Sequence, residues 1–113
     1  DGLQVRDFNY IDDVVEALLM VAATEAADGQ IYNLGSDDPI NLINLARLLI
    51  EINGGGQYEL RPFPTDRKRI DIGDYYGDYR RIRSKLGWRP LVGLRDGMTR
   101  SLDYFRQHLE HYI

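Results

Sequence analysis

The 113-residue sequence contains no cysteine, which excludes disulfide bonds and thiolate-ligated metal sites. The same absence fits a reducing compartment, so we expect a cytoplasmic protein. No run of about 18 apolar residues occurs, which predicts that no segment of this sequence crosses a membrane as a helix. The net charge is −4, which argues against nucleic acid or an anionic membrane as a partner.

Residues that could catalyse a reaction are also scarce. The only histidines, His108 and His111, have no third ligand near them in sequence, so we predict no metal site. Neither a G-x-x-G-x-x-G fingerprint nor a Y-x-x-x-K pair occurs. The glycine run 54–56 follows a predicted helix and precedes a predicted strand, which reverses the order found in phosphate-binding loops. Asp37 and Asp38 are typical of a turn or a helix cap. We therefore expect no catalytic residue and no cofactor-binding residue.

The apolar pattern of the chain predicts a small mixed domain. Three long segments have the 3.6-residue spacing of amphipathic helices, and a shorter helix is expected to end at Gly87. These predicted helices cover residues 11–27, 42–53 after an Asn41 cap, 80–86, and the chain from about 94. The predicted strands or extended segments are residues 5–10, 30–34 and 58–61, whereas residues 65–79 have no clear pattern. We predict the α+β class: one domain over residues 1–113, with about three main helices and short strands.

Arginines form the most informative polar pattern. Arg6 lies between a predicted strand and a predicted helix, and Arg67 and Arg69 flank a lysine in the unassigned stretch. A guanidinium binds phosphate with two parallel hydrogen bonds, so separated arginines that converge on one pocket can hold a diphosphate. Spacing alone leaves open the alternative that these are unrelated surface charges.

Three stretches of the sequence carry a family resemblance. They read VRDFNYIDDVVEAL, IYNLGSDDPINLINLARLLIE and DIGDYYGDYRRIRSKLGWRPLVGLRDGM. In this order and spacing they resemble the extended short-chain dehydrogenases/reductases, which are the NAD-dependent nucleotide-sugar epimerases and dehydratases. The segment IDIGDYYGDY and the C-terminal residues HLEHYI are most similar to UDP-glucose 4-epimerase-like members of this family. The resemblance covers essentially all 113 residues.

The resemblance implies the C-terminal, substrate-binding portion of a Rossmann-type α/β enzyme. In the family, the N-terminal Rossmann domain holds NAD and the catalytic Ser/Thr, Tyr and Lys, and we expect that domain to be missing from this sequence. The cofactor would therefore be NAD in the intact enzyme and none in this fragment, and the 113 residues alone should be inactive. In an epimerase of the family, NAD⁺ oxidises the sugar, commonly at C4, to a keto intermediate, and hydride then returns to the other face. The parent enzyme is expected to be a homodimer, and the fragment is expected to self-associate through exposed apolar surface.

The resemblance also implies roles for individual residues. Arg6 matches the arginine that contacts the nucleotide diphosphate, and Asn33 matches an asparagine near the nucleotide. The second phosphate contact falls on Arg67 or Arg69, because the loop lacks the proline-glycine step that would align it uniquely. Asp78 matches the aspartate that precedes the L-G-W segment.

The expected ligand is a nucleotide-diphospho-sugar, with a UDP-sugar as the first choice. A 4,6-dehydratase or decarboxylase of the same superfamily is the enzymatic alternative to an epimerase. A stand-alone, non-catalytic module that binds anions or a partner is the third possibility, since the sequence contains no catalytic machinery.

Overall fold

The computed structural model describes residues 2–113, and these divide into two compact units. The first unit consists of residues 2–6, 40–75 and 95–113, and the second consists of residues 7–39 and 76–94. Each unit therefore joins segments that lie far apart in the sequence.

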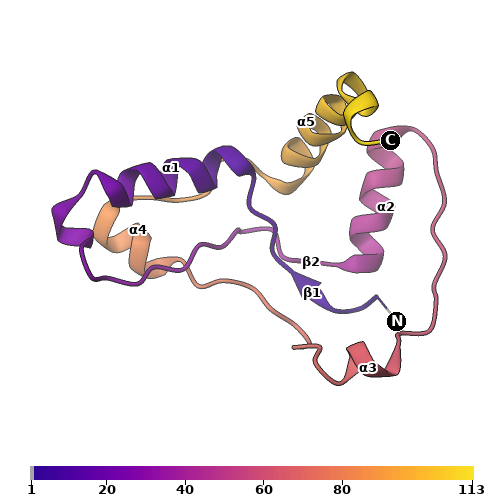
Figure 1. The fold of residues 1–113 in the computed structure, drawn as a ribbon, viewed down its shortest axis with the longest axis horizontal. Coiled ribbons are helices and arrows are strands. Elements are labelled where there is room, and N and C mark those ends of the chain that lie inside the picture. The colour runs from indigo at the N-terminus through magenta and orange to yellow at the C-terminus, as the bar shows by residue number, and fades with distance from the viewer. Residues whose placement is uncertain (1) are drawn as a thin grey trace. The chain divides into compact units, whose positions relative to one another are not determined.

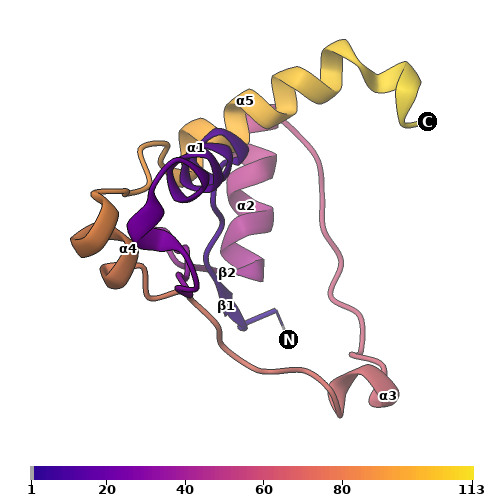
Figure 2. The same cartoon turned by 60° about the vertical axis from the view of Figure 1, so that its left-hand side comes forward.

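The first unit contains a small sheet and two long helices (Figures 1 and 2). Strand β1 (Val5–Arg6) pairs antiparallel with β2 (Ile40–Asn41), and helix α2 (Leu42–Asn53) begins directly after β2. Helix α5 (Leu94–Gln107) belongs to this unit from its second residue and is followed by the short helix η2 (Leu109–His111).

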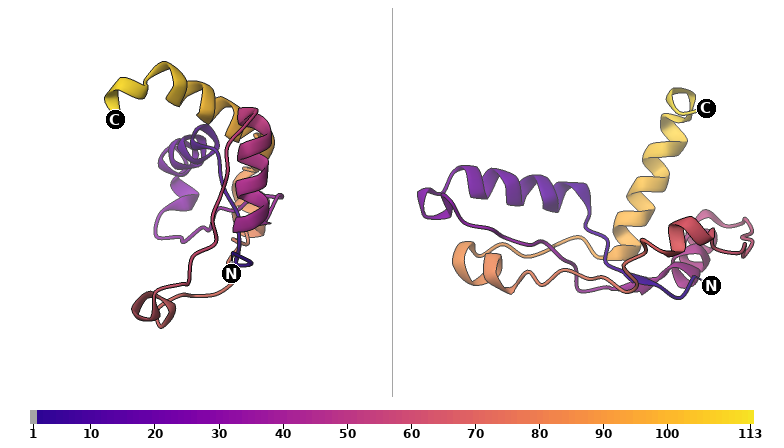
Figure 3. Two further views of the ribbon diagram at one scale, coloured as in Figure 1. Left: turned by 90° about the vertical axis from the view of Figure 1, so that its right-hand side faces the viewer. Right: turned by 60° about the horizontal axis from the view of Figure 1, so that its bottom comes forward.

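Two side-chain contacts join α5 to α2 within the first unit. Arg95 donates to Glu51 at 2.9 Å, and Arg106 donates to the Asn53 side chain at 2.9 Å. Residues 54–64 leave the end of α2 as an extended connection that leads to the short helix α3 (Thr65–Lys68), as Figure 2 and the left view of Figure 3 show.

Helix α2 starts directly after Asn41, the residue that the sequence predicts as its cap. The Asn41 side chain accepts a hydrogen bond from the backbone N–H of Asn44 at 2.8 Å, which satisfies one of the free donors of the first turn. We expect Asn41→Ala to lower the free energy of unfolding by about 1 kcal/mol, measured by urea denaturation. Asn41→Asp keeps the acceptor and should keep the stability; an equal loss in both variants would contradict the capping role.

The second unit is built on helices α1 (Ile11–Ala22) and α4 (Arg80–Leu86), with the short helix η1 (Glu25–Ala27) between α1 and an extended stretch (Figure 1; Figure 3, right). Its core consists of Ala17, Ile82 and Trp88, which are 2%, 0% and 2% exposed. Partly buried apolar side chains surround them: Met20, Val21, Tyr32, Leu34, Tyr79 and Leu86.

Asp13 fastens the segment around Trp88 to α1. The indole Nε1–H of Trp88 donates to the backbone oxygen of Asp13 at 2.9 Å, and the backbone N–H of Val92 donates to the Asp13 carboxylate at 3.0 Å. Asp13 is the one charged side chain that is buried among the described residues, and this backbone donor compensates part of its desolvation.

The four predicted helices are confirmed, with α1 ending at Ala22 and η1 continuing its predicted range. Gly87 ends α4 in the left-handed conformation, at a φ of 79°. The sequence predicts this helix end, because glycine adopts that conformation readily. The predicted mixed α+β class with three main helices is confirmed as well.

Two predicted strands are wrong. Residues 30–34 and 58–61 form no strand, and the first predicted strand is limited to Val5–Arg6. A strand exists only where its backbone groups pair with a neighbour, and β1 and β2 are the only paired strands in the part of the chain that the structure describes. The branched and aromatic residues of both segments therefore indicated extended backbone but not pairing. No helix among residues 2–113 has the length and apolar character needed to cross a bilayer.

Candidate functional site

Arg6 holds a loop of the first unit onto strand β1. Its Nη1 donates to the backbone oxygen of Val5 at 2.8 Å and also to the backbone oxygen of Gly73. Its Nη2 contacts the Asp71 carboxylate at 3.4 Å, a distance at which the hydrogen bond is weak. The side chain is 25% exposed, so the guanidinium has internal partners and still reaches the surface.

The loop is tied to β1 by backbone groups as well. The N–H of Val5 donates to Asp74 at 2.8 Å, and the N–H of Tyr75 donates to the backbone oxygen of Val5 at 3.0 Å. The N–H of Gly73 donates to Asp71 at 3.2 Å, which closes a turn within the loop. Residues 71–75 are therefore positioned by β1, although the sequence pattern assigns them no structure.

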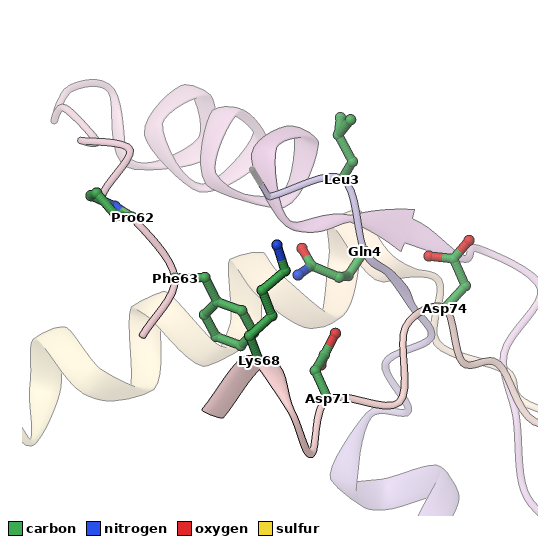
Figure 4. Close-up of a pocket in the computed structure, with 7 residues that line it drawn as sticks. All are labelled: Leu3, Gln4, Pro62, Phe63, Lys68, Asp71 and Asp74. Atoms are coloured by element: carbon green, nitrogen blue, oxygen red, sulfur yellow. The ribbon is translucent and has the colours of Figure 1, made fainter. Parts of the chain in front are cut away.

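A pocket of about 650 Å³ lies beside this loop within the first unit (Figure 4). Such a volume is typical of small-molecule sites. Two carboxylates, one amide, one ammonium group and three apolar side chains line it: Asp71, Asp74, Gln4, Lys68, Leu3, Pro62 and Phe63. Asp71 belongs both to the pocket wall and to the contacts of Arg6, which places the predicted arginine next to the pocket.

Helix α3 adds a run of free positive charges to this unit. The side chains of Arg67, Lys68 and Arg69 are exposed and make no hydrogen bond or ion pair with any described residue. Lys68 also lines the pocket, and Figure 4 shows its ammonium group directed toward the Gln4 amide. Cations without an internal partner are available to an external anion.

The other two predicted site residues belong to the second unit. Asn33 is exposed, and its side chain has no hydrogen-bond partner among residues 2–113. Asp78 binds the Arg80 side chain at 2.9 Å and accepts from the Arg80 backbone N–H at 3.0 Å, and these hydrogen bonds lower the Asp78 pKa to about 2. Asp78 is therefore ionised at neutral pH and paired at the start of α4. The structure places Arg6, Arg67 and Arg69 in one unit, and Asn33 and Asp78 in the other.

Sequence reasoning missed Gln4 as a pocket residue. Its Oε1 is shielded from solvent and has no hydrogen-bond partner among the described residues. Side chains alternate along extended backbone, so residues 4 and 6 are expected on the same side of the chain. That alternation, counted back from Arg6, is the signal that could have identified Gln4.

The chain matches known protein families and structures over nearly its whole length. A sequence model of the family described as GDP-mannose 4,6 dehydratase matches residues 1–101. UDP-glucuronic acid decarboxylase 1 of Xenopus tropicalis is 33% identical over 114 residues, which cover 97% of this chain and 25% of that protein.

Two solved structures have the same fold. UDP-glucose 4-epimerase of Thermotoga maritima, solved with UDP-glucose, has a TM-score of 0.84 and 34% identity, covering 96% of this chain and 34% of its own. dTDP-glucose 4,6-dehydratase of Streptomyces venezuelae, solved with NAD bound, has a TM-score of 0.85 and 25% identity. The match covers 99% of this chain and 34% of the dehydratase chain. The chain thus spans a quarter to a third of the length of these proteins.

The family model covers most of the chain. A decarboxylase, an epimerase and a dehydratase are all similar to the chain. The resemblance seen in the sequence is therefore confirmed. This chain belongs to the GDP-mannose 4,6-dehydratase family, among the NAD-dependent epimerases and dehydratases of the extended short-chain dehydrogenase/reductase type.

Proposed function

We propose that the chain is the part of an NAD-dependent epimerase or dehydratase that binds a nucleotide-diphospho-sugar. The observation that supports this most directly is the pocket of the first unit, with free cations at α3 and Arg6 behind its wall. Structures of similar proteins were solved with UDP-glucose and with UDP-glucuronic acid, which are ligands of this class.

The part of these residues in a reaction would be binding and orientation. A diphosphate carries several negative charges, and guanidinium groups bind its oxygens with charge-assisted hydrogen bonds. Arg67 or Arg69 would contact the diphosphate directly, since both side chains lack internal partners in the described chain. Arg6 would contribute its exposed side while it holds the loop. Fixing the phosphates limits the motion of the attached sugar, which is how binding energy is used to orient a reacting carbon.

NAD is the cofactor of the intact enzyme in this proposal, but the described residues do not fit it. The glycine run 54–56 lies at the C-terminus of α2. Gly54 adopts a φ of 73°, and its backbone N–H donates to the backbone oxygen of Glu51. A helix C-terminus presents carbonyl oxygens and partial negative charge, which disfavour a pyrophosphate. NAD would therefore be held by other residues of the intact enzyme.

We further propose sugar C4 epimerisation as the reaction, supported by the 34% identity to UDP-glucose 4-epimerase. A 4,6-dehydratase or a decarboxylase is the alternative, favoured by the relatives with those activities. Incubating the intact enzyme with UDP-glucose and UDP-glucuronic acid, followed by mass spectrometry and NMR, separates them. An isomer of unchanged mass supports the epimerase, loss of water the dehydratase and loss of carbon dioxide the decarboxylase.

A stand-alone, non-catalytic module stays a third proposal. Calorimetric titration of the 113-residue chain with UDP-glucose, pyrophosphate and NAD addresses it. We expect weak binding of UDP-glucose and no binding of NAD. Binding of pyrophosphate as tight as that of UDP-glucose would favour a simple anion-binding module. A cytoplasmic homodimer as the parent assembly likewise stays a prediction.

Arg6→Ala should weaken nucleotide-sugar binding. Loss of charge-assisted hydrogen bonds would cost about 2 kcal/mol, equivalent to roughly a 30-fold higher KM or Kd for UDP-glucose. Steady-state kinetics of the intact enzyme, or titration of the chain, measures this effect.

Two controls separate the phosphate role from the structural role of Arg6. Arg61→Ala removes an exposed arginine of the same unit, which pairs with Glu59 at 3.0 Å, and should leave the affinity unchanged. Arg6→Lys keeps the charge but cannot make the same fork of hydrogen bonds. If Arg6→Ala lowers the stability while KM and kcat stay at their original values, Arg6 only holds the loop.

A further inference from the structure

We propose that Asn53, the last residue of helix α2, is a site of spontaneous deamidation, and that Arg106 of helix α5 slows this reaction. The modification is independent of any ligand, because it changes only the chain itself. In its first step the backbone nitrogen of Gly54 attacks the side-chain carbonyl carbon of Asn53. A C–N bond forms, the proton of the Gly54 N–H passes through solvent to the departing nitrogen, and ammonia leaves behind a succinimide ring.

The second step needs only water. Water opens the succinimide at one of its two C–N bonds, and no electrons are gained or lost. One opening gives an aspartate on the ordinary backbone, and the other gives an isoaspartate, whose backbone runs through the former side-chain carbon. In both products a carboxylate replaces the neutral amide at position 53, so the chain gains one negative charge.

The sequence allows this attack at a single asparagine. The side chain of the following residue obstructs the approach of its backbone nitrogen, and glycine has no Cβ and the widest backbone freedom. Asn53 is the only asparagine in the sequence that precedes a glycine. A Cβ built on Gly54 or Gly55 meets no atom within 4 Å, so the backbone here lies open to water.

The end of α2 brings the reacting groups near each other. The Asn53 Nδ2 donates to the backbone oxygen of Gly55 at 3.0 Å, which directs the side chain forward along the chain past Gly54. The Gly54 N–H donates to the Glu51 oxygen at 3.2 Å, the long end of the usual range. Residues 53–56 are exposed, and the helix passes directly into the extended connection (Figure 1). Helix ends of this kind fray, and fraying releases the attacking nitrogen.

Arg106 restrains the same side chain from the neighbouring helix. Its Nη2 donates to the Asn53 Oδ1 at 2.9 Å, and its Nη1 binds Asp103 at 2.9 Å. Asn53 and Arg106 belong to the same unit. Succinimide formation needs the Asn53 side chain to rotate and the last turn of α2 to open, so this contact must break first. Because exposed contacts are weak, the protection is partial.

Ageing of the folded chain at mildly alkaline pH tests the site, with peptide mapping by mass spectrometry and an isoaspartyl methyltransferase assay as readouts. We expect aspartate and isoaspartate to accumulate at Asn53. Asn44 is the internal control: it is exposed on the same helix and its Oδ1 accepts from Arg47 at 3.3 Å, but a leucine follows it. Asn44 should stay intact. If Asn53 stays as intact as Asn44, the proposal is overturned.

Two variants test the role of Arg106. Arg106→Ala should deamidate at Asn53 roughly twofold to fivefold faster, because one exposed, charge-assisted contact is lost. Arg106→Lys keeps a charged donor without the fork, so its rate should lie between those of Arg106→Ala and the original chain. Circular dichroism checks that both variants stay folded, and the lysine variant carries the test if the alanine variant does not.

Arg47→Ala is the matched control, since it removes the corresponding contact from Asn44 and should leave both asparagines at their original rates. Deamidation at Asn53 that is equally fast or slower in both Arg106 variants overturns the protective role of Arg106. Acceleration by Arg47→Ala as large as that by Arg106→Ala overturns it as well, because the effect would then not come from the contact with Asn53.

Discussion

Gly77→Ala is expected to destabilise the second unit severely. A Cβ at position 77 would lie 1.9 Å from the backbone oxygen of Leu34, far inside the contact distance of a carbon and an oxygen. The obstacle is backbone, so it cannot rotate aside as a flexible side chain would. Forcing extra atoms into a packed region costs about 1–3 kcal/mol, and we expect the upper end of that range or more here. Urea denaturation followed by circular dichroism measures the change.

The close approach behind this prediction is held by Asp7. Its carboxylate accepts from the N–H of Gly77 at 2.8 Å and from the N–H of Ser36 at 3.3 Å, so one side chain fixes both backbone segments. A Cβ on Gly35 would meet the same contact from the other side, 2.3 Å from the backbone oxygen of Gly77. Gly35→Ala should therefore destabilise in a similar way, and the double variant should lose less than the sum of the two, because both break one contact.

Gly55→Ala is the matched control for both glycine variants. A Cβ at position 55 meets no atom within 4 Å, and the backbone there does not require a positive φ. Alanine restricts the unfolded chain, so this variant should be neutral or stabilised by up to about 1 kcal/mol. Equal stabilities of Gly77→Ala and Gly55→Ala would show that the segments at residues 34–35 and 77 are not in contact.

The helices could be predicted from the sequence because their signals are local. The cap at Asn41 acts on the N–H of Asn44, and Gly87 ends α4 through its own left-handed backbone. Both effects act within a few residues, which is the range of a periodicity argument. The resemblance to the family was visible for the same reason, since its motifs are short and continuous.

Strands and site contacts depend on partners that lie far away in the sequence, and the local sequence does not identify them. The predicted strand at residues 30–34 has the right composition but no partner strand among the described residues. Arg6 was expected to await an external anion, and the structure shows it bound to Gly73, which lies 67 positions away. The division into two units joins segments separated by more than 30 residues, which no local pattern encodes. The phosphate role of Arg6, Arg67 and Arg69 therefore stays a prediction that binding experiments must decide.

Trp88→Ala should have an effect comparable to that of the glycine variants, through a cavity instead of a clash. Trp88 is 2% exposed, packs its ring edge-on against Tyr79 at a centroid distance of 5.8 Å, and donates its indole N–H to Asp13. Replacing a buried tryptophan by alanine typically costs about 3–5 kcal/mol. Stabilities of whole domains are about 5–15 kcal/mol, so this variant should lose a large fraction of the stability of the second unit.

Two comparisons assign the cause of that loss. Trp88→Phe keeps most of the apolar volume and loses the indole donor, so it should lose only about 1–3 kcal/mol, chiefly because the buried oxygen of Asp13 is left without this partner. Tyr58→Ala removes an aromatic side chain that is 43% exposed and should change the stability by less than about 0.5 kcal/mol. Circular dichroism is the readout, since Trp88 is the only tryptophan and its fluorescence disappears with it. A loss below about 1 kcal/mol in Trp88→Ala would mean that α1 and α4 are held together by something other than the cluster of Ala17, Ile82 and Trp88.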